Sequence, residues 1–326
     1  MHRGSAFVIM MEITIIIPVY NREKLLPRTL ASVVAQTYRP LHVVLVDNGS
    51  TDRSLAVLHD FCDKYAASDF RVTVCEELNS GAPSARNAGL RRATSEWVMF
   101  FDSDDEMGTC LVENYVSTIG KNPDADIVYT DMKIVDDAGY SMIKRSPRKG
   151  GIHFLCGNIF HTYFSTQRYM VRRDVIEAVG AWNPKTFGWD DWELGVRLML
   201  YTSRIVKAVS SEPQVIVHAH ADSITGTQYS DKVDELLACV DEAEKHVRAL
   251  GRRDAGILLN CLDYKKIVLA GACSREGSMR GKLLFHDVLK GVPSRKVKAV
   301  FVSGYWLASR GVRGTARVAE RLFRLF

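Results

Sequence analysis

The sequence predicts an α/β fold, with a Rossmann-like, mostly parallel sheet flanked by helices and a C-terminal helical extension. Two patterns support this prediction. Over the first hundred residues, short runs of apolar, β-branched residues alternate with helical stretches, which is typical of parallel strands joined by right-handed crossovers. From about residue 230 onward, helical periodicity replaces the strand pattern. The composition, with 47% hydrophobic and 25% charged residues, is that of a globular protein.

Four strands are expected in this first part of the chain. Three of them, at 12–20, 41–47 and 96–102, are continuous apolar runs instead of alternating ones, which indicates burial on both faces of the sheet. The expected strands span residues 12–20, 41–47, 71–77 and 96–102.

A helix is expected after each of the first three strands. Pro27 fits within the first turn of the first helix, where no amide donor is needed. Ser50 or Thr51 is the expected N-cap of the second helix, because a hydroxyl there can accept a bond from the first turn. The first expected helix begins after Asn21, and the three expected helices end near residue 37, near residue 65 and near residue 94.

After residue 102 the alternation of strands and helices is less regular. We expect a strand with its turn at 124–136, a helix behind the acidic start of 188–200, and an edge strand at 213–220. The predicted organisation is an N-terminal extension, a main α/β domain and a helical, basic C-terminal region, at residues 1–10, 11–228 and 229–326.

Several features bear on the compartment. Glu12 interrupts the N-terminal apolar run and no small-residue cleavage site follows it, so we do not expect a signal peptide. No stretch reaches the roughly 18 uninterrupted apolar residues of a spanning helix. The seven cysteines form no C-x-x-C pair and are odd in number, which indicates reduced, mostly structural thiols. We therefore expect a cytoplasmic protein that is not integral to a membrane.

Polar residues follow three of the expected strands at their C-terminal ends. Tyr20, Asp47 and Asp102 hold these positions. In open parallel sheets, ligands bind outside the carboxyl ends of the strands. Three polar residues at this edge predict a binding site there.

The stretch EWVMFFDSDDE, residues 96–106, has three carboxylates directly after an apolar run. One interpretation is a solvated turn at the edge of the sheet. The other is that Asp102 and Asp104, which point to the same side, hold a divalent cation. Mg²⁺ and similar hard ions accept few carboxylates together with phosphate oxygens, so this pattern suits a metal that bridges protein and diphosphate.

Three segments together resemble family 2 of the inverting GT-A glycosyltransferases. They are IIIPVYNREKLLPRTLASVVAQT, VVLVDNGSTD and SGAPSARNAGLRRATSEWVMFFDSDDE, in the family's order and with similar spacing over residues 12–225. The resemblance implies that 11–228 is a GT-A catalytic domain. It also implies a nucleotide-diphosphate-sugar donor, most often UDP-linked, a divalent metal (Mn²⁺ or Mg²⁺) and inversion at the anomeric carbon.

The resemblance also implies roles for individual donor-site residues. Residues Pro18, Val19, Tyr20 and Asn21 would lie under the nucleobase, with Asp47 bonded to the base or the ribose, and Arg86 would lie beside the nucleotide unless it is a helix-surface arginine. Asp102, Ser103 and Asp104 match the D-x-D motif, with Asp104 the direct metal ligand and Asp105 a cap of the following turn or a water-mediated ligand. The family often has two aspartates where this chain has Asp47 and Asn48.

A second acidic site lies in FGWDDWELGVR. An inverting transfer needs a general base for the acceptor hydroxyl, and a carboxylate suits this role. By resemblance Asp191 is the expected base, with Asp190 standing where the family usually has Glu. We expect Asp190, Trp189 and Trp192 to contact the acceptor, since sugar rings stack on aromatic side chains. The alternative is an acidic pair that only complements the helix dipole.

Two histidines lie in VIVHAHADSIT. A His-x-His pair can bind zinc, but no third ligand is evident nearby. By resemblance His220 contacts the metal or the diphosphate, and His218 has a structural role. A structural role for both is the alternative.

The C-terminal region is basic, with eleven Lys or Arg against two acids from Arg280 onward. In TARVAERLFRLF, residues 315–326, apolar and basic residues lie on opposite faces, which is typical of an interfacial helix. We therefore expect contact with a membrane surface. The family resemblance implies that this is the inner face of the cytoplasmic membrane, and that the acceptor is a saccharide or a lipid-linked saccharide of cell-surface polysaccharide synthesis. The alternative is a helix packed on its own domain.

Three rival functions are weighed against the transferase. A sugar-nucleotide pyrophosphorylase needs a glycine-rich loop after the first strand, and PVYNREKLLP has no glycine. A nucleic-acid-binding protein needs aromatics in an open basic groove, whereas the basic residues here cluster in the tail. A non-catalytic sugar-nucleotide-binding protein would not need Asp102, Asp104 and Asp191. We expect no nucleic-acid partner.

Overall fold

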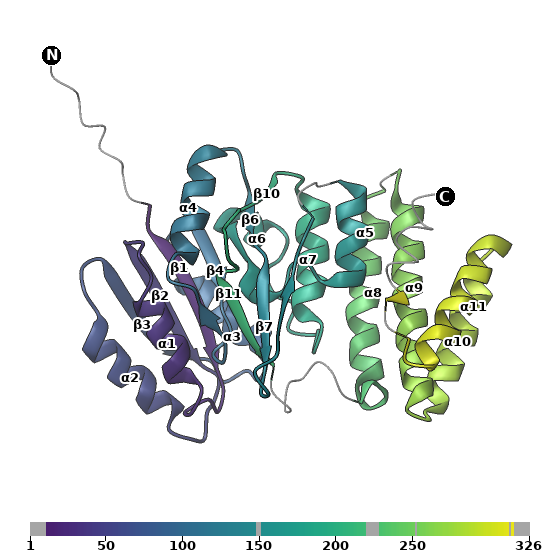
Figure 1. Ribbon diagram of the computed structural model, residues 1–326, viewed down its shortest axis with the longest axis horizontal. Coiled ribbons are helices and arrows are strands. Elements are labelled where there is room, and N and C mark those ends of the chain that lie inside the picture. Colours follow the sequence, from purple (N-terminus) through teal and green to yellow (C-terminus); the bar gives the residue numbers. More distant parts are fainter. Residues whose placement is uncertain (1–10, 148–150, 220–227, 252, 313, 316–326) are drawn as a thin grey trace, which may run out of the picture. The chain divides into compact units, whose positions relative to one another are not determined.

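The computed structural model describes residues 11–147, 151–219, 228–251, 253–312 and 314–315 (Figure 1). The chain divides into two compact units. The first contains the described residues of 1–145, 166–181 and 204–219, and the second those of 146–165, 182–203 and 220–326. The N-terminal extension predicted at 1–10 lies outside the described residues. The boundary between residues 228 and 229 stays a prediction about where the catalytic domain ends.

The first unit is built on a seven-stranded sheet in the order β10-β6-β9-β4-β1-β2-β3. Neighbouring strands are parallel except β9, which runs antiparallel to both β4 and β6. The strands are β1 (Ile13–Val19), β2 (Leu41–Asp47), β3 (Phe70–Glu76), β4 (Trp97–Phe100), β6 (Ile127–Tyr129), β9 (Tyr169–Arg172) and β10 (Ile205–Lys207). The mostly parallel α/β fold predicted from the sequence is confirmed, and β1 and β2 are buried along their whole length.

Helices cover both faces of this sheet. Alternate residues of β1, from Ile13 to Val19, pack in one core with apolar side chains of three helices, while α3 packs on the opposite face beside Ile16. A Cβ on Gly89 of α3 would collide with the Ile16 side chain, so the helix approaches the sheet closely only because this position is glycine. The helices are α1 (Leu26–Val34), α2 (Ser54–Tyr65), α4 (Leu111–Lys121), α3 (Ala82–Arg92) and the short α6 (Arg173–Ala178).

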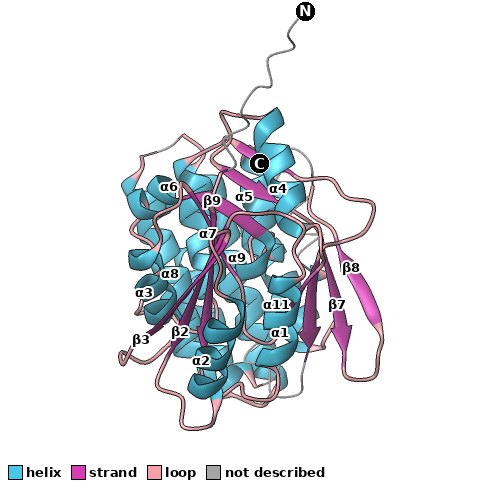
Figure 2. Cartoon of the chain, turned by 90° about the vertical axis from the view of Figure 1, so that its left-hand side faces the viewer, coloured by secondary structure: helices cyan, strands magenta, loops and turns pink. Residues whose placement is uncertain are grey.

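A second sheet of the first unit has the order β5-β11-β7-β8, and Figure 2 shows β7 and β8 apart from β2 and β3. Its strands are β5 (Glu106–Met107), β7 (Met132–Asp136), β8 (Ser141–Lys144) and β11 (Val215–Ala219). Two predictions were wrong here. The expected strand at 124–136 is two strands, β6 and β7, in different sheets. The strand expected at the sheet edge, at 213–220, is an inner strand, because β11 pairs with β7 on one side and with β5 on the other.

The first two helices begin later than expected. We predicted a helix from Asn21, but α1 begins at Leu26, with Pro27 in its first turn as expected. We predicted Ser50 or Thr51 as the cap of α2, but α2 begins at Ser54, without a side-chain cap bond. The physical reason is that the two loops bond to each other instead of to their own helices, as described below.

The second unit is helical. It contains α5 (Ile152–His161), α7 (Asp190–Tyr201), α8 (Val233–Ala249), α9 (Ala255–Arg275), α10 (Met279–Gly291) and α11 (Arg295–Ser309). This confirms the predicted helical C-terminal region, and α10 and α11 both lie against α9 (Figure 1). A Cβ on Gly271 or Gly281 would come within 3 Å of the backbone of the neighbouring helix, so glycines allow these helices to pack closely. No helix in the described part of the chain is both long and apolar enough to span a bilayer.

Candidate functional site

The loop after β1 is bonded to the loop after β2. Asn21 has a φ of 49°, its backbone N–H donates to Ser50 Oγ at 3.0 Å, and its side-chain oxygen accepts from the Thr51 N–H at 2.8 Å. The Arg22 N–H donates to Ser54 Oγ at 2.7 Å. These hydroxyls are therefore used between loops, which explains why they do not cap α2. Tyr20 is left 56% exposed beside them.

Asp47 and Asn48 organise the end of β2. Pro18 and Val19 of β1 pair with Val46 and Asp47. The Asp47 carboxylate is buried, and its Oδ2 accepts from the N–H groups of residues 49 and 50 at 3.1 and 2.9 Å. Its Oδ1 has no hydrogen-bond partner among the described residues. A buried carboxylate oxygen without a partner at a strand end is suited to accept a bond from a ligand.

Asn48 stands where the family often has a second aspartate. Its amide nitrogen donates to the carbonyls of Glu77 and Asn79 at 2.6 and 2.9 Å, and its amide oxygen accepts from the Gly81 N–H at 2.9 Å. A carboxylate could not donate to these carbonyls. Asn48 therefore holds the loop that leads into α3, the helix that carries Arg86.

Asp102 lies at the centre of a polar network after β4. Arg86, which is 6% exposed, donates from Nη2 to Asp102 Oδ1 at 2.8 Å. Gln167 donates from Nε2 to Asp102 Oδ2 at 2.8 Å and also bonds to Asp105 Oδ2. Asp105 Oδ1 accepts from the backbone N–H of His218 in β11 at 2.9 Å. Segments far apart in the sequence thus meet around two carboxylates. The buried Arg86 is not a helix-surface arginine.

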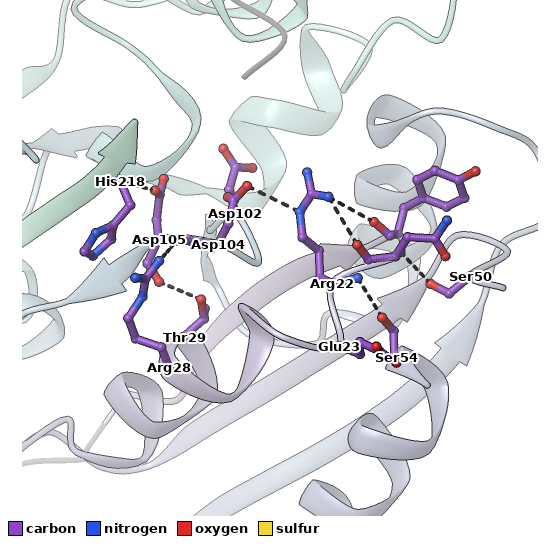
Figure 3. Close-up of polar contacts among 12 residues, drawn as sticks. Arg22, Glu23, Arg28, Thr29, Ser50, Ser54, Asp102, Asp104, Asp105 and His218 are labelled. Atoms are coloured by element: carbon purple, nitrogen blue, oxygen red, sulfur yellow. Dashed lines mark hydrogen bonds and ion pairs between the residues drawn. The ribbon is translucent and has the colours of Figure 1, made fainter. Parts of the chain in front are cut away.

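Residues of the first turn of α1 and of the loop before it hold the rest of this segment (Figure 3). Arg22 Nε lies 3.3 Å from Asp104 Oδ2, and its Nη1 donates to the carbonyl of Asn21 at 3.3 Å. Arg28 donates to the Asp104 carbonyl and the Thr29 hydroxyl to the Asp105 carbonyl, both at 2.6 Å. The backbone after β4 is therefore fixed, while the Asp104 side chain remains 25% exposed.

The carboxylates of this segment influence one another. Burial raises the pKa of Asp105 well above its ordinary value, and the nearby charges of Asp102 and Asp104 raise it further. Asp105, which we expected to cap the following turn or to bind a metal through water, is 3% exposed and bonds to Gln167 and β11. A cation at this edge would reduce the repulsion among the three groups.

The donor set fits a cation that needs few protein ligands. Within the described residues, no group of three or more His, Cys, Asp or Glu side chains is arranged to hold a metal ion. Asp102 and Asp104 offer partly exposed carboxylate oxygens, which suits Mg²⁺ or Mn²⁺ bound mainly through a diphosphate. His220 lies outside the described residues. His218 Nε2 lies 3.3 Å from Glu106 Oε2, as expected for a structural histidine.

The predicted base and acceptor residues lie in the second unit. Asp190 and Asp191 are the first two residues of α7, and both are half-buried. Asp191 Oδ1 accepts from the Trp192 N–H at 2.6 Å. Trp192 is fully buried, and its indole N–H donates to the Ile159 carbonyl at 3.1 Å. This burial corrects our expectation that Trp192 stacks on a sugar ring. Trp189 is only half-buried.

The structure thus brings the predicted donor residues together in the first unit, with the 6%-exposed Ser103 beside Asp102, and places Asp191 in the second. Their roles as ligands or base remain predictions. Sequence reasoning missed Arg22, Thr29 and Gln167. No signal marked Gln167, because it lies 65 residues from Asp102 and its neighbours in STQRY give no motif.

The chain is similar to known proteins in sequence and in fold. The model of glycosyl transferase family 2 matches residues 14–180. Glycosyltransferase GlyA of Streptococcus pneumoniae serotype 4 is 38% identical over 110 residues, which are 34% of this chain and 15% of that protein. The chain therefore spans only a small part of this relative. A PGL/p-HBAD biosynthesis glycosyltransferase of Mycobacterium bovis (strain BCG) is 29% identical over 187 residues, or 56% of this chain and 68% of that protein.

The fold is also similar to that of a solved structure, S. aureus TarS 1–349 in complex with UDP-GlcNAc. The TM-score is 0.68 at 18% sequence identity, and the superposition covers 97% of this chain and 92% of the other. At this identity the likeness concerns the fold, including the mostly parallel sheet and the helical C-terminal region.

Proposed function

The chain belongs to glycosyl transferase family 2, and we propose that it transfers a sugar from a nucleotide-diphosphate sugar to a saccharide acceptor with inversion of the anomeric carbon. UDP is the proposed nucleotide. It is the nucleotide of the donor in the TarS complex, whose fold this chain shares. Non-catalytic binding of a sugar nucleotide and pyrophosphorolysis are the alternatives that the test below addresses.

One observation carries the proposal. The ends of β1, β2 and β4 lie at one edge of the sheet. Asp47 at this edge has a buried carboxylate oxygen without a partner among the described residues. The same edge carries Asp102, which is hydrogen-bonded to Arg86 and Gln167. Such an edge is where open parallel sheets bind nucleotides. We assign residues 18–21 and Asp47 to the nucleoside, and Arg86, Asp102 and Ser103 to the diphosphate sugar.

Asp104, with Asp102, is the proposed ligand of Mn²⁺ or Mg²⁺, and His220 is a further proposed ligand. When bound, the cation supplies positive charge against the donor diphosphate. Arg22 Nε lies 3.3 Å from Asp104 Oδ2. With the cation bound, Arg22 is positioned either to keep this ion pair or to contact a phosphate oxygen of the donor. An arginine is well suited to a phosphate because its charge is permanent and its donors are arranged in a fork.

The proposed general base is Asp191. The acceptor hydroxyl oxygen attacks the anomeric carbon as the bond from that carbon to the diphosphate oxygen breaks. The nucleoside diphosphate leaves with the bonding electron pair, and the hydroxyl proton passes to the Asp191 carboxylate. Asp190 and Trp189, which precede it at the start of α7, are the proposed acceptor contacts.

The proposed acceptor is a saccharide, lipid-linked, of cell-surface polysaccharide synthesis, used at the inner face of the cytoplasmic membrane. The helices α10 and α11 support contact with a lipid surface. Trp306 and Leu283 are each 53% exposed on them. Arg310 lies over the Trp306 ring, 3.6 Å from its centroid, and these two helices also carry Lys282, Lys290 and Arg295. Apolar side chains among basic ones are typical of helices that bind anionic lipids. The segment 315–326, which we expected to form an interfacial helix, lies outside the described residues after residue 315.

The test is calorimetry of UDP binding with Mn²⁺ and with EDTA, on the wild type and on Asp104→Ala. We expect binding that needs both the metal and Asp104. The matched control is Asp124→Ala, which removes an exposed carboxylate after α4 and should bind UDP as the wild type does. If UDP, GDP and dTDP all fail to bind the wild type with Mn²⁺, the transferase proposal is overturned. Release of UDP from a UDP-sugar then separates catalysis from binding alone.

A further inference from the structure

A lysine of the C-terminal helices lies between the two tryptophans at the start of α7. Lys265 of α9 places its Nζ 4.0 Å from the ring centroid of Trp189 and 4.4 Å from that of Trp192. The two rings themselves meet edge to face, with centroids 5.9 Å apart. An ammonium near two indole rings is attracted by both, which restricts the positions of all three side chains.

The same three-residue group is attached to α5 through one carbonyl. The oxygen of Ile159 accepts from Lys265 Nζ and from the Trp192 indole N–H, each at 3.1 Å. Lysine is strongly hydrated in water, so a half-buried ammonium needs such partners to replace its solvation. Lys265 therefore connects α9 to α5 and to the first turn of α7.

The neighbouring lysine, Lys266, has different contact partners. Lys266 Nζ lies 2.8 Å from Asp241 and 2.9 Å from Glu244, both on α8. It ties α8 to α9 and contacts neither tryptophan in the contacts described above. Of these two adjacent lysines on α9, Lys266 therefore contacts α8, and Lys265 contacts the tryptophans at the start of α7.

We propose that Lys265 is a positioning residue for the reaction. Through Trp189 and Trp192 it fixes the first turn of α7, which carries Asp190 and Asp191. This inference rests on the proposed function, in which Asp191 is the base. It makes the C-terminal helical region a part of the catalytic apparatus, because the group that orients the base comes from α9. Asp191 itself bonds to the backbone of Trp192, so movement of that ring is transmitted to the carboxylate.

The first measurement is hydrogen exchange of the full-length protein, followed for the peptide that covers the start of α7. In Lys265→Met, which keeps an unbranched side chain one atom shorter and removes the charge, we expect at least tenfold faster exchange there. Lys265→Arg should restore most of the protection, because a guanidinium also stacks on indole rings. Lys266→Met is the matched control and should leave this peptide unchanged. Wild-type protection in Lys265→Met would overturn the proposal.

The second measurement is UDP release from UDP-GlcNAc, UDP-glucose and UDP-galactose, with UDP affinity measured in parallel. We expect Lys265→Met to release UDP at least tenfold more slowly at an affinity within twofold of the wild type. In the Asp191→Asn background, the same change should add no further loss. If Asp191→Asn is as active as the wild type, the proposed base is wrong. If Asp191→Asn is inactive but Lys265→Met is fully active, only the positioning role is wrong.

Discussion

The proposed donor edge of the first unit, formed by the strand ends with Asp47, Asp102 and Asp105, and the start of α7 in the second unit hold their carboxylates by different means. Around Asp102 and Asp105, each of the four carboxylate oxygens accepts a hydrogen bond from Arg86, Gln167 or the β11 backbone. At the start of α7, which carries Asp191, the contacts described above include the rings of Trp189 and Trp192, which pack against Lys265. The first arrangement depends on polar groups meeting at strand ends, and the second on helices packing together.

This difference teaches where each kind of site can be altered. A hydrogen-bonded network loses a definite bond when one side chain is changed, so the effect should be local to ligand affinity. A site held by packing should respond mainly in the rate, because the geometry of the base changes while the donor groups remain.

Asp191→Asn should have the largest effect. The amide cannot accept the proton of the acceptor hydroxyl, so we expect about a 10³-fold slower UDP release, within the usual range for loss of a general base. UDP affinity should stay within twofold, as measured by calorimetry. Asp190→Asn should cost less, because Asp190 is proposed to contact the acceptor and not to take the proton. Equal losses in the two variants would contradict the assignment of the base.

Gln167→Met should weaken the donor edge. The substitution removes the Gln167 amide, which bonds to both Asp102 and Asp105. We therefore expect about tenfold weaker UDP binding in the presence of Mn²⁺, equivalent to about 1.4 kcal/mol. Gln36→Met is the matched control. Gln36 is also buried, and its amide donates to the carbonyls of Ser32 and Gly108 instead of to carboxylates. The control should lower stability but not affinity, and equal affinity losses would show that the effect is not specific to the carboxylates.

Asn48→Asp should destabilise the first unit moderately. The change introduces the second aspartate that is frequent in the family, but it removes the donors to the Glu77 and Asn79 carbonyls. We expect the free energy of unfolding to fall by about 1–2 kcal/mol, measured by urea denaturation. The control Asn122→Asp loses a single bond, to the Thr118 carbonyl, so its free energy of unfolding should fall by less. A stability equal to that of the wild type would mean that the loop after β3 rearranges.

Asp263→Asn should produce the smallest effect, in the helices of the second unit. Burial raises the pKa of Asp263 to about 6, against the opposing charge of Lys266. The folded state therefore binds this proton more tightly than the unfolded state, and the free energy of unfolding contributed by Asp263 falls as pH rises from about 4 to about 6. The amide removes this fall, so we expect a gain of about 1 kcal/mol at pH 7 after allowance for solvent screening.

The measurement for this last prediction is urea denaturation between pH 4.5 and pH 7. Only the difference between Asp263→Asn and the wild type is interpreted, since other groups titrate in the same interval. A difference that does not increase with pH would contradict the raised pKa. Asp263 lies on α9 but does not take part in the contacts of Lys265 with Trp189 and Trp192 described above. UDP release by Asp263→Asn should therefore equal that of the wild type.

Much of the donor edge was predictable because it depends on local order in the sequence. Continuous apolar runs predicted β1, β2 and β4, and the ends of these runs placed Asp47 and Asp102 on one edge. The starts of α1 and α2 were predicted wrongly, since Ser50 and Ser54 bond to the loop after β1 instead of capping their own helix. Local capping preferences cannot anticipate a partner about 30 residues away.

The alternation of strands and helices, the acidic ends of the strands and the acidic start of α7 could be predicted from the sequence, because each follows from the order of neighbouring residues. Which distant side chains complete these sites depends on tertiary packing. Gln167 reaches Asp102 because the antiparallel β9 pairs with β4, and Lys265 reaches Trp189 because α9 packs against α5. Such contacts depend on how whole elements pack, and the residues that make them carry no local pattern of their own.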